Sequence, residues 1–244
     1  MSRAQKWRIC LIGGPTTINL LRRTKIQMKK RSGYFEDIQK DLKRTYPMDE
    51  FFTNHIGDLS CILNNYAYVN EGMGYAQGMA FLAFNLFRVF YEDDPVYAVE
   101  DTFYSFHKLV HVVRPAYPLS TKDQKVLVFN KNSALCVHLL IAKRSTELAT
   151  KVKEIAIVDI FIQQVLPSMF GTKFITEDCA ILFDFIIEKR TFDMFHRILC
   201  IIAAMILSID KVIMNMSYES ILGIMQHRGC YKVRRVIAIA YSIL

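Results

Sequence analysis

Apolar residues recur at helical spacing over most of this chain, most regularly in its C-terminal half. The spacing i, i+3, i+4 and i+7, typical of helices with one buried face, is found in residues 126–140, 155–166, 177–187, 192–207 and 217–225. Thr176 and Ser217 each precede first-turn acids, which predicts helix starts at these positions. Asn-Gly turns and sustained polar-apolar alternation, the signals of strands, are absent. The pattern therefore predicts an all-α protein.

The N-terminal half predicts further helices. Residues 3–11 predict the first, with Trp7 as its core anchor and Gly13-Gly14-Pro15 at its end. Apolar residues at helical spacing over 59–69 predict a second helix. Asp94-Pro95 predicts the start of a third, because proline is favoured in a first turn.

Two prolines within residues 114–118 predict a loop that separates two lobes. A chain of 244 residues is long enough for one sizeable core or for two small lobes of one domain. We expect a single domain over residues 1–244, with an N-terminal lobe of residues 1–113 and a C-terminal helical lobe of residues 119–244. A last helix is expected over residues 231–244.

The first of two polar clusters lies in residues 38–47. On a helix, Asp41 and Arg44 share a face, and Ile38, Asp41 and Thr45 form a ridge on that side. Pro47 predicts that the helix ends between residues 44 and 46. The rigid guanidinium fork of an arginine at a helix end suits phosphate oxygens. The alternative is an ordinary surface ion pair that contributes a few tenths of a kcal/mol.

The second polar cluster is Gly74-Tyr75-Ala76-Gln77-Gly78-Met79, directly before an apolar helical run. A glutamine amide offers one acceptor and two donors on one plane, so Gln77 can orient a water molecule and contact a phosphoryl oxygen at once. An arginine that neutralises developing charge and a glutamine that positions the attacking water are the two parts that GTP hydrolysis needs. The alternative for Gln77 is a hydrogen bond to a free backbone N–H at the helix start.

These clusters carry a resemblance to a known family. Ile38-x-x-Asp41-x-x-Arg44-Thr45 and Tyr75-x-Gln77 match the two signature motifs of the TBC domain (Tre-2/Bub2/Cdc16), found in GTPase-activating proteins for Rab-type small G proteins. Residues 65–79 and the hydrophobic-Asp-hydrophobic segment 181–186 also resemble the family pattern, and Arg3-x-x-x-Trp7 matches part of a third motif, with Cys10 where leucine is usual.

The resemblance implies a mechanism with two fingers supplied in trans to a Rab-family G protein in its GTP form. Arg44 would be the arginine finger, and Gln77 would replace the G protein's own water-positioning glutamine. The supporting residues implied are Ile38, Asp41, Thr45, Tyr75 and Gly78. GTP and Mg²⁺ would belong to the partner, so the chain is expected to need no cofactor or metal and not to hydrolyse GTP by itself. Departures from the family pattern are Tyr46, Ala76, Ala80 and the turn Glu71-Gly72.

Two other functions fit part of the sequence. A TBC-like module that binds a G protein or another partner as a scaffold would need neither Arg44 nor Gln77. The net charge of +8 suggests nucleic-acid binding as an alternative function. The cations are spread along the chain without interleaved aromatic residues, however, so no nucleic-acid partner is expected. The basic segment 22–31 fits an acidic lipid, protein or nucleic-acid surface, or else a solvated face or mobile connection.

No feature of the sequence predicts a metal site or a membrane span. His107 and His111 lie four residues apart without a carboxylate beside them, and the six cysteines are scattered. The longest uninterrupted apolar run, residues 198–207, is too short to cross a bilayer, and the N-terminus has no signal-peptide pattern. We expect a cytoplasmic monomer with a role in vesicle trafficking, recruited to intracellular membranes through its partner.

Overall fold

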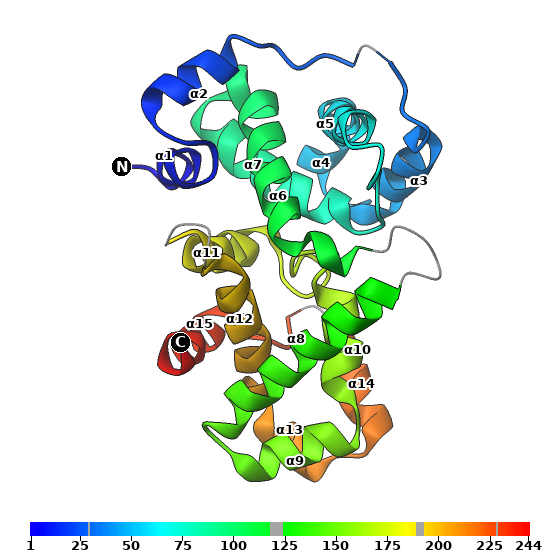
Figure 1. Cartoon of the computed structure of the whole chain (residues 1–244), viewed down its shortest axis with the longest axis vertical. Coiled ribbons are helices and arrows are strands. Elements are labelled where there is room, and N and C mark those ends of the chain that lie inside the picture. Colours follow the sequence, from blue (N-terminus) through cyan, green and yellow to red (C-terminus); the bar gives the residue numbers. More distant parts are fainter. Residues whose placement is uncertain (29, 118–123, 189–192, 228) are drawn as a thin grey trace. The chain divides into compact units, whose positions relative to one another are not determined.

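The computed structural model describes residues 1–244 except 29, 118–123, 189–192 and 228 (Figure 1). Helices dominate it, and no strand occurs in the described ranges, so the all-α prediction is confirmed. The chain divides into two compact units. The first comprises Met1–Thr121 and Pro167–Met169, and the second comprises Lys122–Leu166 and Phe170–Leu244. The segment Pro167–Met169, from the second half of the sequence, thus belongs to the first unit.

The described residues of the first unit form seven α-helices and three short helical segments of other kinds. In chain order they are α1 (Arg3–Trp7), η1 (Arg8–Ile12), α2 (Pro15–Arg22), α3 (Phe35–Thr45), α4 (Glu50–Asn54), α5 (Ile56–Val69), α6 (Met79–Asp93), η2 (Pro95–Tyr97), α7 (Ala98–Val113) and η3 (Arg114–Ala116). Sequence reasoning missed α2 and α4. It predicted one helix over residues 3–11, whereas the second part, η1, is a π-helix.

Helix α6 forms the centre of the first unit, because its apolar residues are buried on several sides. Trp7 is 1% exposed and packs edge-on against Phe90 of α6 at 6.1 Å between ring centroids, which confirms it as a core anchor. Near the other end of α6, the ring of Phe84 lies 4.9 Å from the rings of both Tyr46 and Phe52. These aromatic contacts fix the C-terminal end of α3 against α6.

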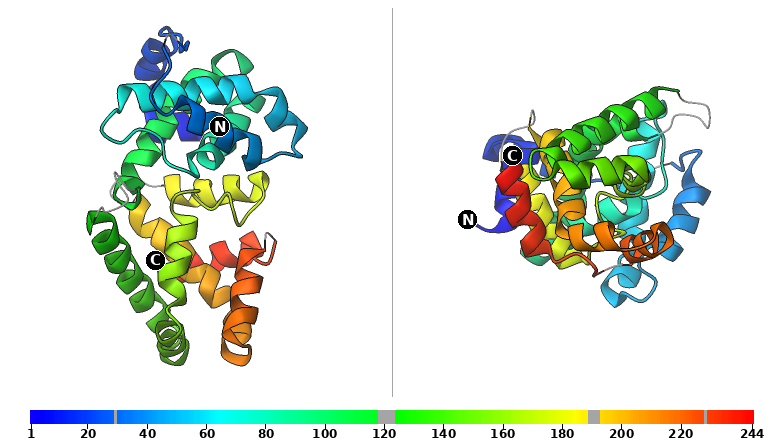
Figure 2. Two further views of the ribbon diagram at one scale, coloured as in Figure 1. Left: turned by 90° about the vertical axis from the view of Figure 1, so that its right-hand side faces the viewer. Right: turned by 90° about the horizontal axis from the view of Figure 1, so that it is seen from below.

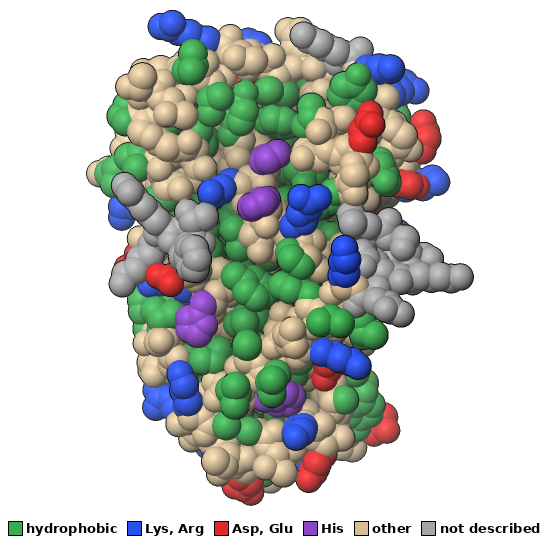
Figure 3. Space-filling view, in the orientation of Figure 1, with side chains coloured by type: hydrophobic (Ala, Val, Ile, Leu, Met, Phe, Trp, Pro, Cys, Tyr) green, Lys and Arg blue, Asp and Glu red, His purple; other side chains and the backbone are tan. Residues whose placement is uncertain are grey.

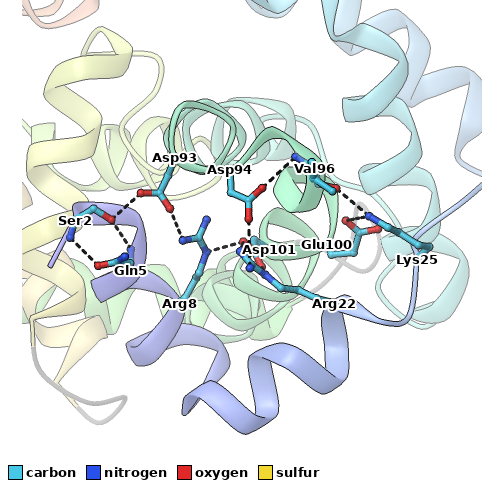
Figure 4. A network of polar contacts seen from close by, with 10 residues as sticks. All are labelled: Ser2, Gln5, Arg8, Arg22, Lys25, Asp93, Asp94, Val96, Glu100 and Asp101. Carbon is cyan, nitrogen blue, oxygen red and sulfur yellow. Dashed lines mark hydrogen bonds and ion pairs between the residues drawn. The ribbon is translucent and has the colours of Figure 1, made fainter.

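The N-terminal segment is attached to α6 and α7 by a network of ion pairs (Figure 4). The carboxylate of Asp101 accepts hydrogen bonds from Arg8 Nε at 2.6 Å and from Arg22 Nη2 at 2.6 Å, and Arg8 also pairs with Asp93 at 2.5 Å. Lys25 donates to the carbonyl of Val96 at 2.9 Å. The start of the basic segment 22–31 is therefore held by intramolecular contacts rather than forming a solvated face.

Eight α-helices are formed by the part of the second unit that the structure describes. They are α8 (Gln124–Ala142), α9 (Thr146–Glu154), α10 (Ile157–Val165), α11 (Thr176–Ile187), α12 (Met194–Ser208), α13 (Asp210–Asn215), α14 (Tyr218–Gln226) and α15 (Val233–Ile243). Helix α12 is its core, with all of residues 197–206 buried, and it packs against α8, α11 and α15 (Figure 2). The apolar periodicity predicted five of these eight helices closely and α15 nearly as well.

Helix starts in the second unit agree with sequence reasoning only in part. Ser217 caps α14 by accepting from the N–H of Ser220, as predicted. Thr176 is instead the first residue of α11, and Ile175 holds the cap position. The predicted helix 155–166 begins later, because Ala156 has a left-handed backbone (φ 49°) that separates α9 from α10. Phe192, the predicted start of α12, lies outside the described residues.

Helix α8 contains the window Lys125–Ala142, which by length and composition alone is apolar enough to cross a membrane. Its mean hydropathy is 1.2, and 33% of the window is buried. The length of uninterrupted apolar runs did not predict this segment, because polar residues interrupt it. One such helix is weak evidence for a span, because core helices of soluble proteins pass the same test.

Candidate functional site

Helix α3 presents one buried ridge and one exposed arginine. Ile38, Asp41 and Thr45, which helical spacing placed on one side of the helix, are 0%, 3% and 4% exposed. The Thr45 hydroxyl donates to the carbonyl oxygen of Asp41 at 2.7 Å. The helix ends at Thr45, two residues before Pro47, and Tyr46 is its C-cap. The buried ridge therefore anchors the last turn, which carries Arg44.

The buried carboxylate of Asp41 connects the two polar clusters. Its Oδ1 accepts a hydrogen bond from Arg44 Nε at 2.9 Å. Its Oδ2 accepts from the Tyr75 hydroxyl and from the backbone N–H of Gly78 at 3.2 Å. Asp41 thus bonds to the arginine of the first cluster and to both residues that flank Ala76 and Gln77 in the second. An ordinary surface ion pair has none of these further contacts, so that alternative is wrong for this pair.

Arg44 and Gln77 both point polar groups to solvent. The Arg44 side chain is 60% exposed and uses only Nε in the contact with Asp41, which leaves the two terminal nitrogens of its fork for a ligand. Gln77 is exposed, and within the described part of the chain its amide makes no hydrogen bond. The amide therefore does not satisfy a backbone N–H at the start of α6, which was the alternative reading of this residue.

The turn before α6 has a backbone shape that only glycine adopts easily. Gly74 and Gly78 have φ angles of 63° and 101°, a region that side chains with a Cβ disfavour. A Cβ on Gly74 would lie 2.1 Å from the Tyr34 ring, and one on Gly78 would lie 2.9 Å from the carbonyl oxygen of Pro167. Gln77 is therefore presented by a turn that is tightly packed on both sides.

Three residues of this neighbourhood were not predicted from the sequence. Tyr34 packs against Gly74, and Pro167 packs against Gly78. The hydroxyl of Tyr117, which is 2% exposed, donates to the carbonyl of Pro167 at 3.2 Å. Pro167 is far from residues 38–79 along the chain, so no local pattern reveals its place beside Gly78. The proline loop at residues 114–118 was noted only as a boundary between lobes.

Tyr75 is held as a neutral hydrogen-bond donor. Burial raises the pKa of its phenol far above the ordinary value, and the charge of Asp41 and the hydrogen bond to it raise it further. The proton therefore stays on Tyr75 at any physiological pH, and the hydroxyl continues to donate to Asp41. Both oxygens of this carboxylate are thereby engaged by protein donors.

Within the described ranges, no group of three or more His, Cys, Asp or Glu side chains is arranged to hold a metal ion. His107 and His111 lie together beside a cavity, but no third ligand of this kind joins them among the same residues. The cluster around Asp41 offers donors, namely the Arg44 fork and the Gln77 amide, which suit an anionic or phosphoryl ligand.

Comparison with known proteins relates the chain to a domain family and to solved structures. The family model for the Rab-GTPase-TBC domain matches residues 2–214. The crystal structure of the Ypt/Rab-GAP domain of Gyp1p is similar over 99% of this chain and 86% of that one, with a TM-score of 0.79 and 16% sequence identity. At that identity the likeness establishes a shared fold. A comparison with curated protein sequences gives no match.

Proposed function

The chain belongs to the Rab-GTPase-TBC domain family, and on this premise we propose that it accelerates GTP hydrolysis by a Rab-family G protein through Arg44 and Gln77. Family membership supports the class of partner, a Rab GTPase. The two exposed side chains support the mechanism, since they are the donors that phosphoryl transfer requires from a partner in trans.

Arg44 contributes a positive charge to the phosphates of bound GTP. The guanidinium remains charged throughout the physiological range, and its free terminal nitrogens can bind two oxygens at once. As bridging and terminal oxygens gain negative charge in the transition state, this contact strengthens, which lowers the barrier. Asp41 acts on Arg44 as a positioning residue, because its bond to Nε holds the guanidinium without using the two terminal nitrogens.

Gln77 positions the attacking water. Its carbonyl oxygen accepts a hydrogen bond from the water while its NH₂ group donates to a phosphoryl oxygen, so one planar group orients both reactants. The turn that carries it is held by the Gly78 N–H bond to Asp41 and by the packing of Gly74 and Gly78. A rigid support keeps the amide in place without a hydrogen bond from it to the described residues.

The observation that carries the proposal is the shared anchor of the two side chains. One buried carboxylate, Asp41, bonds to Arg44 and to the residue directly after Gln77. This link fixes the spacing of the two groups, as a reaction needs when both must reach one phosphoryl group. GTP and Mg²⁺ then belong to the G protein, and this chain supplies side chains only. Recruitment to a membrane would come through the G protein.

The test is GTP hydrolysis by a panel of GTP-loaded Rab proteins with the wild-type chain, Arg44→Ala and Gln77→Ala. We expect acceleration of one or a few members, lost in both variants. Lys43→Ala and Gln163→Ala are the matched controls, since both are exposed residues of the same or similar type. Detectable binding without acceleration by the folded wild-type chain would contradict the proposal and identify a scaffold module instead.

A further inference from the structure

A row of three cationic or protonatable side chains lies along one side of α7 and η3. His107, His111 and Arg114 are spaced four and three residues apart, which places them on one helix face, and all three are exposed. The space-filling view shows histidine side chains next to lysine and arginine side chains on this part of the first unit (Figure 3). The function proposed above uses none of these residues.

The three side chains line a small polar cavity of about 80 Å³, whose other walls include Tyr66 and the turn at Gly72 and Met73. The Tyr66 ring packs across His107 at 5.7 Å between centroids, and its hydroxyl contacts Met73 Sδ at 3.6 Å. No Asp or Glu is among the described residues that line this cavity. The cavity therefore offers hydrogen-bond donors and positive charge without a carboxylate to balance them.

A larger cavity of mixed lining adjoins the same histidines, and we call it the apolar cavity after its wall of Leu11, Ile12 and Leu21. It has a volume of about 370 Å³ and is lined by Leu11, Ile12, Leu21, Tyr104, His107, Lys108 and His111. Its volume lies in the range of about 300–1,000 Å³ that small-molecule sites occupy. Leu11 and Ile12 belong to the π-helix η1, and π-helical turns are frequent at functional sites. The two histidines thus separate a polar cavity from an apolar one.

The histidine pair can donate hydrogen bonds to an anion. Burial lowers the pKa of His107, and the neighbouring His111 lowers it further by electrostatic repulsion. A neutral imidazole still donates one ring N–H, and Arg114 adds a permanent charge beside the pair. Asn70, which also lines the polar cavity, donates its amide to the carbonyl of Tyr66 at 2.9 Å.

We propose that this face of α7 is a binding site for an amphiphile with a phosphate head group. His107, His111 and Arg114 hold the phosphate in the polar cavity. A short aliphatic tail lies in the apolar cavity against Leu11, Ile12 and Leu21. The site is distinct from the cluster around Asp41, and its test does not depend on GTPase activation.

The first experiment is titration calorimetry of the wild-type chain with octyl phosphate below its micelle concentration, inorganic phosphate and octyl glucoside. The expected result is one octyl phosphate per chain, bound about tenfold or more tightly than either of the other two, because only it fills both cavities. Equal affinities for octyl phosphate and octyl glucoside, or no saturable binding, would overturn the proposal.

Variants then assign the binding to these residues. His107→Gln/His111→Gln is expected to weaken octyl phosphate binding about tenfold or more, and His227→Gln, at an exposed histidine of the second unit, to leave it unchanged. Thermal melting establishes that each variant is folded. If the double histidine variant does not fold, Arg114→Gln, which changes an exposed side chain, is used in the binding measurement instead. Full binding by every folded variant of the three residues would refute the site.

Flotation with phosphatidylcholine vesicles, with and without phosphatidic acid, distinguishes the sources of the phosphate. Flotation that requires phosphatidic acid and is lost in Arg114→Gln identifies a membrane lipid. Binding of octyl phosphate without flotation identifies a soluble single-chain amphiphile.

Discussion

Asp41 is the residue on which the geometry of the candidate site depends, because its two oxygens serve three donors from different parts of the chain. Removing its charge while keeping its size changes each contact. An asparagine offers one acceptor oxygen, and its NH₂ group faces donors on the other side. The Gly78 N–H or the Tyr75 hydroxyl is then left without an acceptor in a buried place.

We therefore predict that Asp41→Asn lowers the free energy of unfolding by about 1–3 kcal/mol, the cost of an unsatisfied buried polar group. GTPase activation should fall as well, because Arg44 and the Gln77 turn lose their common anchor. Urea denaturation and single-turnover GTP hydrolysis measure the two effects. Asp37→Asn is the control, since Asp37 lies on the same helix but is 67% exposed in its ion pair with Lys40. Equal effects in the two variants would contradict the role given to Asp41.

Arg44→Lys tests whether GTPase activation requires the planar guanidinium of residue 44 or only a positive charge there. An ammonium cannot bind two phosphoryl oxygens in the planar geometry of a guanidinium. We expect activation to fall nearly as far as in Arg44→Ala, where the loss should be about 10³- to 10⁵-fold. Single-turnover hydrolysis at saturating concentrations of the chain measures the chemical step. A lysine variant with near wild-type activity would show that a point charge suffices.

At the scale of elements, the site joins the end of α3 to the turn before α6. Local sequence was enough to predict the end of α3, because Pro47 acts on the residues directly before it. Helical spacing also predicted that Ile38, Asp41 and Thr45 share one side of the helix, but not that this side is buried. It did not predict that Asp41 bonds to Gly78, since the signal for that contact lies in two segments separated by α4 and α5.

Other parts of the fold were missed for similar physical reasons. Helices α4 and α13 are too short to display a clear apolar period, and α9 is largely polar. The place of Pro167 beside Gly78 depends on the path of the chain between the two units, which no local pattern encodes. The resemblance to the TBC motifs supplied the roles proposed for Arg44 and Gln77, whereas the residue chemistry of the first cluster alone left an ordinary surface ion pair open for Arg44.

The two glycines of the turn and its neighbour Gly72 provide a matched test of backbone shape. Gly78→Ala places a Cβ 2.9 Å from the Pro167 carbonyl oxygen at a φ of 101°, which costs on the order of 1–3 kcal/mol. We expect lower thermal stability and a large loss of activation, since Gln77 must move with its neighbour. A Cβ on Gly72 meets nothing within 4 Å, so Gly72→Ala should retain both properties. Full activity of Gly78→Ala would mean that the turn does not position Gln77.

At the scale of the whole molecule, the ion pairs of the N-terminal segment connect stability to pH. Arg8 lowers the pKa of Asp93, chiefly through a hydrogen bond, and Ser2 and Arg22 lower it further. A carboxyl with a lower pKa in the folded state binds fewer protons there than in the unfolded chain. Its contribution to stability is therefore present above its unfolded pKa of about 4 and is lost as the pH falls below that value.

We predict that Asp93→Asn reduces the loss of stability between about pH 5 and pH 3 relative to wild type. Urea denaturation at a series of pH values measures the slopes. Asp58→Asn is the control, because the carboxylate of Asp58 is half-exposed and its partner is His55. An unchanged slope in Asp93→Asn would mean that the N-terminal ion pair does not contribute to acid sensitivity.

The central claim is that Gln77 supplies in trans the function of the G protein's own water-positioning glutamine. The most direct measurement is single-turnover hydrolysis by a responsive Rab protein whose own glutamine is replaced by alanine. The account predicts that the wild-type chain still accelerates hydrolysis by this Rab variant and that Gln77→Ala does not. Failure of the folded wild-type chain to activate the Rab variant, while it activates the unmodified Rab, would contradict the claim.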